Sequence, residues 1–211
     1  LALAQDITIV KDDLERYNNN SIEDGSISSV TNKNIQLIED TTNMLSEHQL
    51  SLVTNAVLEA KNVVFFGVGS SGLTAEHARY RFIRVGLPVE ALTDGHLAPV
   101  RASLMSSKDV AIVISVSGST VDIVEVAQIA KNRGAKVICI TCHAKSPVTK
   151  YADIVLLTAS KEKPTNSSTL STVISQLHIL EIIFVSTLNR LGDKGTAMLQ
   201  NMAKITSKKL F

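Results

Sequence analysis

The sequence predicts an α/β fold: a doubly wound, three-layer sandwich built around a five-stranded parallel sheet. Three observations support this prediction. Short apolar runs alternate with helical spacing from residue 63 onward, which is typical of βαβ units. The first run, residues 63–66, is apolar without a break, as in a strand buried on both faces of a parallel sheet. Glycines follow it at once, and a helical pattern begins behind them. Ligands of such sheets bind beyond the carboxyl ends of the strands, where the strand order reverses.

The expected elements follow in chain order. A helix over residues 1–16 and a polar, turn-rich linker around residues 18–26 come first. Apolar residues three and four apart then predict helices at about 31–45 and 47–60. The predicted strands are 63–66, 88–91, 110–115, 136–141 and 154–157. The predicted connections are helices at about 72–85, 94–104 and 120–132, a short turn near Val148, and a long last helix at about 168–191.

Composition bounds the function classes. With 211 residues, 45% of them hydrophobic, the chain has room for one α/β domain with appended helices. The formal net charge of +1 gives no overall excess of positive charge with which the chain could bind nucleic acid. Two cysteines without a signal-peptide pattern indicate a reducing cytoplasm, and the apolar runs are too short to predict a membrane partner. The chain starts at Leu1 inside a predicted helix, so we expect it to be a piece of a longer protein.

A glycine-serine turn follows the first strand. Gly67, Gly69 and Gly72 enclose Ser70 and Ser71, and a helix follows. Glycines let backbone N–H groups approach a ligand, the helix dipole favours an anion, and serine hydroxyls add donors. The turn also fits the Gly-x-Gly-x-x-Gly pattern of dinucleotide-binding folds. Because Glu90 lies near the end of the next strand, where a ribose-binding acid is expected, a dinucleotide site is one alternative.

A second hydroxyl-rich turn follows the third strand. It runs Ser115-Val116-Ser117-Gly118-Ser119-Thr120 and opens the next helix. A nicotinamide site does not require such a turn, whereas a small phosphorylated ligand does, because two helix N-termini and several hydroxyls then converge on one phosphate. Neither turn contains Lys or Arg, so neutral donors would hold the anion. The structural alternative is that Gly72 serves helix packing and that Ser70, Ser71 and Thr120 cap helices.

The motifs Gly67-x-Gly69-Ser70-Ser71-Gly72 and Ser115-x-Ser117-Gly118-x-Thr120 resemble those of the sugar isomerase (SIS) domain. That domain binds phosphosugars in isomerases, in glucosamine-6-phosphate synthase and in bacterial regulators. The resemblance covers about residues 31–191. The chain is most similar to the effector domain of RpiR-type transcriptional regulators, through residues 65–72, residues 167–171 and the pair Gln176-Leu177. It implies the SIS fold over residues 30–211, with residues 1–29 as the tail of a helix-turn-helix domain plus a linker.

The resemblance also implies roles for individual residues. Ser71, Ser115, Ser117 and Thr120 would hold the phosphate, and Ser70 and backbone N–H groups near Gly69 and Gly118 would assist. Glu162 lies in the region where sugar isomerases keep a catalytic acid, and Ser168 lies at the start of the last helix; both are further expected contacts. Val116 stands where the synthase has a glutamine, which argues against synthase-like chemistry and leaves the phosphate site intact.

We therefore expect the effector-binding domain of a bacterial transcriptional regulator that senses a phosphorylated sugar and controls sugar-metabolism genes. It would bind DNA through an N-terminal domain absent from this chain and form a homodimer or tetramer through the helix at 31–45 and the last helix. We expect no cofactor, no metal and no catalytic residue. The alternative is a stand-alone aldose–ketose phosphosugar isomerase, which needs a placed general base. Its candidates are Glu76, His96, His143 and Glu162.

Cys139 and Cys142 form a Cys-x-x-Cys pattern, which we do not interpret as a redox site. The pair lies within and at the end of a predicted strand, whereas the redox motif opens a helix. Strand alternation also places residues three apart on opposite faces.

Overall fold

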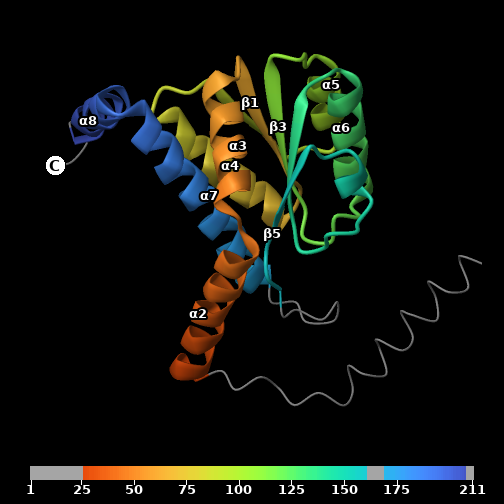
Figure 1. Cartoon of the computed structure of the whole chain (residues 1–211), viewed down its shortest axis with the longest axis vertical. Helices are drawn as coiled ribbons and strands as arrows, with labels where there is room; N and C mark the ends of the chain where they lie inside the picture. Colours follow the sequence, from red (N-terminus) through yellow and green to blue (C-terminus); the bar gives the residue numbers. More distant parts are fainter. Residues whose placement is uncertain (1–25, 161–168, 208–211) are drawn as a thin grey trace, which may run out of the picture.

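The computed structural model describes residues 26–160 and 169–207 (Figure 1). The helix and linker expected within residues 1–25 lie outside the described residues. Five parallel strands form one sheet in the order β2-β1-β3-β4-β5. The strands are β1 (Asn62–Phe66), β2 (Val89–Leu92), β3 (Asp109–Ile114), β4 (Lys136–Thr141) and β5 (Ile154–Leu157). The chain adds β2 on one side of β1 and then crosses to the other side for β3, so the strand order reverses between β1 and β3.

Helices cover both faces of this sheet and complete the predicted three layers (Figure 1). One layer holds α3 (Glu47–Glu59), α4 (Ser70–Ile83) and α7 (Thr169–Leu191). The opposite layer holds α5 (Leu97–Ser103) and α6 (Val121–Asn132), and a 3₁₀ turn, η1 (Val148–Lys150), precedes β5. Two further helices, α2 (Ile27–Met44) and α8 (Asp193–Ser207), extend away from the layers at different ends of the molecule (Figure 1). The predicted doubly wound α/β sandwich is confirmed.

Each strand supplies both hydrophobic cores by alternation of its side chains. Phe65 of β1 faces the layer of α4 and α7, and Phe66 faces the layer of α5 and α6; both are fully buried. Phe65 packs against Phe82 of α4 with ring centroids 5.5 Å apart, and Phe82 packs edge-on against Phe184 of α7 at 5.4 Å. This aromatic column joins β1, α4 and α7, and it fixes the position of the helix that carries Ser70 and Ser71.

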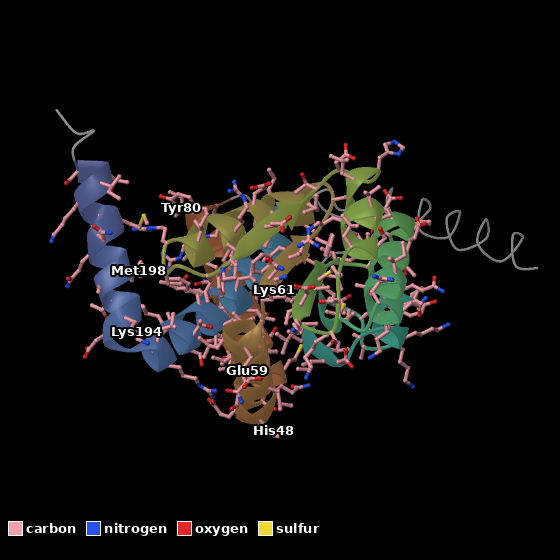
Figure 2. All side chains as sticks on the ribbon, turned by 90° about the horizontal axis from the view of Figure 1, so that it is seen from above. His48, Glu59, Lys61, Tyr80, Lys194 and Met198 are labelled. Atoms are coloured by element: carbon pink, nitrogen blue, oxygen red, sulfur yellow. The ribbon has the colours of Figure 1, made fainter. Side chains whose placement is uncertain are left out.

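The largest difference from the predicted elements is α8, which the sequence analysis missed. Gly192 adopts a positive φ of 55° and ends α7, and α8 begins at the next residue. Figure 2 shows α8 at one end of the molecule, with Met198 on the side that faces the other helices. Met198 lies beside Gly86, where its methyl carbon would be 3.1 Å from an added Cβ. Helix α2 also begins before the predicted residue 31, because Ser26 caps it by accepting a hydrogen bond from Ser29 N–H.

Helix α7 is long and apolar, and part of it is buried in the hydrophobic core. By length and composition its segment Thr172–Leu191 is suited to span a membrane, which was not expected from the apolar runs. In the structure 44% of that segment is buried inside the protein, and Ile179 and Ile183 are almost fully covered by the sheet side of the core. Ile179 and Ile183 thus place one face of α7 in the core of the domain.

The two cysteines lie as the strand pattern predicts. Cys139 is fully buried in the core under α6, and burial raises the pKa of its thiol to about 12. Cys142 lies beyond the end of β4, where its Sγ is 3.1 Å from Thr158 Oγ1, and the two cysteines are not bonded to each other. A buried thiol with a raised pKa is a poor nucleophile, so the structure favours a packing role for Cys139.

Candidate functional site

Two turns begin side by side at the carboxyl edge of the sheet. Strands β1 and β3 are direct neighbours, with Phe66 opposite Val113. The first turn, residues 67–69, leaves β1, and the second turn, residues 115–120, leaves β3. Adjacent strands lie about 5 Å apart, and the strand order reverses between these two. The structure therefore brings together the two turns that the sequence predicted to share a site.

Glycines shape the first turn for two different reasons. A Cβ on Gly67 would lie 2.5 Å from the carbonyl oxygen of Ser71, and one on Gly72 would lie 3.0 Å from the carbonyl oxygen of Gly67. These two glycines serve close packing of the turn, as the structural alternative proposed for Gly72. Gly69 differs, because it has a φ of +57° and open space around its Cα. Its backbone is accessible at the N-terminus of α4.

Ser70 and Ser71 are the first two residues of α4, so neither of them is the cap that the structural alternative required. The N-cap position belongs to Gly69, which makes no side-chain capping bond. Ser71 is only 5% exposed, and its Oγ accepts a hydrogen bond of 3.1 Å from Nε2 of Gln176. A hydroxyl that accepts in this way keeps its own hydrogen for another acceptor.

The second turn is built around a buried serine. The Ser115 N–H continues the strand ladder to the carbonyl oxygen of Ile140 at 3.0 Å. Its Oγ is buried and accepts a 3.1 Å hydrogen bond from the N–H of Gly118. Gly118 has a φ of +63° and lies against Ser146, so the turn admits no side chain there. Like Ser71, Ser115 therefore keeps a hydroxyl hydrogen to donate.

Thr120 occupies the N-cap position of α6, yet its side chain makes no capping hydrogen bond. Its Oγ1 instead lies 3.4 Å from Oγ of Ser115. Ser117 is exposed, and its Oγ accepts a hydrogen bond of 3.2 Å from the N–H of Ser119. Thr120 thus holds the predicted N-cap position without a capping bond, and its hydroxyl lies beside that of Ser115 at the start of α6.

The two turns together present neutral donors. The first N–H groups of α4 and α6 have no side-chain caps, and the hydroxyls of Ser71, Ser115 and Thr120 lie at the same helix ends. Uncapped helix N-termini attract anions through their N–H groups and dipoles. The arrangement is chemically suited to hold a phosphate group without a cation.

Three supporting residues were not predicted as part of the site. Gln176 of α7 donates to Ser71, and Thr93 lies 3.3 Å from the position of a Cβ on Gly72. Thr141 Oγ1 donates to the carbonyl oxygen of Val116 at 3.1 Å, which anchors the second turn to β4. In the sequence Gln176 stood out only as part of the pair Gln176-Leu177, which resembles RpiR-type regulators, and it was given no role in the site.

The structure does not describe two of the predicted ligand contacts, and it gives the acid of the dinucleotide alternative a different partner. Glu162 and Ser168 lie outside the described residues. Glu90, the acid proposed for a dinucleotide ribose, is opposite Val64 in the middle of the strand pairing. Arg101 binds both of its carboxylate oxygens at 2.8 and 2.9 Å, and this hydrogen bonding lowers the pKa of Glu90. The dinucleotide alternative therefore loses its expected acid to a structural ion pair.

Comparison with known proteins identifies the family. The SIS domain family matches residues 57–186 of the chain. The chain belongs to the SIS domain family. An uncharacterized HTH-type transcriptional regulator from Haemophilus influenzae is 38% identical to this SIS chain over 148 residues, which cover 70% of this chain and 51% of that regulator. The chain therefore spans about half the length of this relative.

Solved SIS domains have the same fold. The Vibrio vulnificus NanR protein complexed with ManNAc-6P has a TM-score of 0.83 at 24% identity, covering 89% of this chain and 71% of that one. The sugar isomerase domain of an RpiR transcription factor from Sphaerobacter thermophilus has a TM-score of 0.76 at 20% identity, covering 84% of this chain and 97% of that one. The predicted SIS fold is confirmed. The HTH-type transcriptional regulator RpiR from Escherichia coli is 29% identical to this chain over 160 residues, which cover 76% of this chain and 54% of that regulator, so the predicted likeness to RpiR-type regulators is confirmed as well.

Proposed function

We propose that this SIS domain is the phosphosugar sensor of a bacterial transcriptional regulator that controls sugar-metabolism genes. The observation that supports the proposal most is the pair of hydroxyl-lined turns at β1 and β3, where the strand order reverses. The solved NanR structure contains ManNAc-6P, and the Haemophilus influenzae relative is an HTH-type transcriptional regulator. The NanR complex supports a sugar phosphate as the ligand, and the Haemophilus influenzae relative supports DNA as the target of the whole regulator.

In the proposed complex the phosphate lies between the two turns. Ser71, Ser115, Ser117 and Thr120 donate hydroxyl hydrogens to its oxygens, and N–H groups near Gly69 and Gly118 complete the shell. Hydrogen bonds to a charged acceptor contribute about 1.5–3 kcal/mol each, so a few such donors suffice for a site without Lys or Arg. The sugar part would contact residues beyond the turns, which include Glu162 and Ser168 in our proposal.

The effect of phosphosugar binding on DNA binding would require the whole regulator. We propose that residues 1–29 connect residues 30–211 to an N-terminal DNA-binding domain, and that the regulator works in the cytoplasm. A phosphosugar changes DNA binding only as far as it prefers one arrangement of the protein over another. The signal would therefore be a shift between arrangements of the regulator's subunits.

We further propose that the domain forms a homodimer or a tetramer through α2 and α7. Large apolar side chains of α2 are exposed, among them Ile27 at 88%, Ile35 at 48% and Met44 at 49%. A groove of about 390 Å³ with a mainly apolar lining runs along α7 beside Leu50 and includes Ile182 and Val185. Light scattering should give at least twice the chain mass of 22.7 kDa. A monomer at high concentration would contradict this part of the proposal.

The proposal includes no catalytic role. An aldose–ketose isomerase would need a general base against the sugar carbons. Among the candidates, Glu76 lies on the solvent side of α4 and pairs with Arg79 at 2.8 Å. The isomerase alternative is tested directly by following the bound sugar phosphate by NMR, because conversion to its ketose or aldose partner would overturn the sensor proposal.

The ligand class is tested with a panel of hexose 6-phosphates, pentose 5-phosphates and N-acetylhexosamine 6-phosphates, each beside its unphosphorylated sugar. Thermal shift identifies the ligands, and calorimetry measures their affinity. We expect only phosphorylated sugars to raise the melting temperature. The variant Thr120→Val removes a hydroxyl that makes no capping bond, so affinity should fall about tenfold or more at little cost in stability.

Ser119→Ala is the matched control, since Ser119 lies exposed in the same turn. Ser115→Ala is a less clean variant, because it leaves the buried N–H of Gly118 without its acceptor and should lower stability by about 1–3 kcal/mol. Equal affinity of Thr120→Val, Ser119→Ala and the unchanged protein would contradict the proposal. Equal binding of phosphorylated and unphosphorylated sugars would contradict it as well.

A further inference from the structure

A buried amide of α7 contacts the first turn of α4. Gln176 is 1% exposed, and its Nε2 donates to Oγ of Ser71 at 3.1 Å. Its Oε1 accepts a hydrogen bond of 2.9 Å from Oγ1 of Thr74, which is also 1% exposed. Both ends of the amide therefore have a partner on α4, and in this arrangement the NH₂ end faces Ser71.

The donor end of the amide sets the direction of the Ser71 hydroxyl. An amide NH₂ group can donate but not accept, so Ser71 Oγ must be the acceptor of this bond. Its hydrogen then remains available to a further acceptor. Ser71 is 5% exposed and lies in the first turn of α4, whose N-terminus has no side-chain cap, so a phosphate at that helix end would be such an acceptor.

We infer that Gln176 is a positioning residue: it holds the Ser71 hydroxyl as a donor to the phosphate. The inference rests on the proposed function, because it assigns a task to a residue behind that same site. It adds that α7 takes part in ligand recognition without touching the ligand. The same helix binds α2 through His178, whose Nε2 is 2.9 Å from Thr42 Oγ1.

A purely structural role and a positioning role for Gln176 predict different coupling between Gln176 and Ser71 in phosphate binding. If Gln176 only stabilises the contact between α4 and α7, its removal lowers stability and affects phosphate affinity equally with or without the Ser71 hydroxyl. If Gln176 acts through Ser71, its removal weakens phosphate binding only while that hydroxyl is present. A double-mutant cycle separates the two cases.

The test uses Gln176→Met, Ser71→Ala and the double variant, with inorganic phosphate as the probe. Phosphate is titrated against ¹⁵N-labelled protein, and the backbone amide signals of residues 69–72 report its dissociation constant. We expect Gln176→Met to weaken binding about tenfold when Ser71 is present and by less than twofold in the Ser71→Ala background. Thr187→Val is the control, since Thr187 is equally buried in α7 but bonds only to Ile183 of its own helix.

Gln176→Glu provides a second variant of the same shape. Its carboxylate would accept the Ser71 hydrogen and turn it away from the ligand, so phosphate binding should fall further than in Gln176→Met. Unchanged affinity in either folded variant, or an equal loss in both Ser71 backgrounds, would overturn the inference while the phosphate site stands. An unchanged protein that shows no shifts at residues 69–72 would overturn the proposed function itself, and the inference with it.

Discussion

Gly118 combines a φ of +63° with a close contact to Ser146, whose Oγ occupies the space that a Cβ would need. Gly69 has a similar φ of +57° but nothing within 4 Å of that position. A side chain at Gly69 would therefore meet backbone strain alone, whereas a side chain at Gly118 would meet both backbone strain and a steric collision. Each turn has one glycine with a positive φ, and the conformation of that glycine determines where the neutral N–H and hydroxyl donors of the turn lie.

We predict that Gly118→Ala is more destabilising than Gly69→Ala. Gly69→Ala adds only the backbone strain of a Cβ at φ 57° and ψ −132°, about 1–3 kcal/mol, whereas Gly118→Ala adds a collision inside a packed turn to the strain of its positive φ. Urea unfolding measures both free energies of unfolding. Combining Gly118→Ala with Ser146→Gly should recover part of the loss, and equal losses in the two single variants would contradict this account of the second turn.

Residue types and their order were enough to predict that the two hydroxyl-bearing turns lie at one edge of the sheet, but not which groups their side chains contact. The placement of Ser115 and Thr120 followed from a turn that leaves a buried strand. The hydrogen bond from Gln176 to Ser71 depends on how α7 packs against α4, and this packing cannot be predicted from a local sequence pattern. The pairing of Glu90 with Arg101 was missed for the same reason, because it joins a strand to the helix after it.

Helix α7 is held to its neighbours by several kinds of contact. Glu181 binds Arg81 of α4 at 2.6 Å, and the Arg81 guanidinium lies 4.3 Å from the ring centroid of Phe184. His178 contacts Thr42 of α2. Helix α7 thereby joins α4, which carries the first turn of the site, to α2 near the N-terminal end of the described chain.

Burial lowers the pKa of His178. Because the folded-state pKa lies below the unfolded value of about 6.5, the unfolded state binds more protons as pH falls through that value. We therefore predict that the free energy of unfolding decreases between pH 7.5 and pH 5, and that His178→Gln has a shallower decrease. Urea unfolding at several pH values provides the measurement. Parallel curves for both proteins would show that His178 does not contribute to the pH dependence.

The strands were the elements that the sequence predicted best, because unbroken apolar runs and flanking turns define them locally. Helix ends were less predictable. Helix α4 starts at Ser70 and not at residue 72, since Gly69 supplies the change of backbone direction. Helix α8 was missed although Met198, Met202 and Ile205 recur at helical spacing, and Gly195 is its one buried residue.

At the scale of the whole molecule, the sheet separates two chemically different ends. The carboxyl end carries the two turns with neutral hydroxyl and N–H donors. The amino end carries a cavity of about 560 Å³ lined by three lysines and two acids (Lys61, Lys108, Lys136, Glu59 and Asp109) among other residues, and Figure 2 labels Lys61 and Glu59. A phosphate attracted only by positive charge would choose the lysines, whereas one recognised by the SIS motifs would choose the turns.

The most direct test is a crystal structure of the domain with the sugar phosphate that binds most tightly in the panel. The account predicts the phosphate between the two turns, with its oxygens within hydrogen-bonding distance of the hydroxyls of Ser71, Ser115 and Thr120. A phosphate bound among the lysines at the amino end of the sheet, with both turns empty, would contradict it.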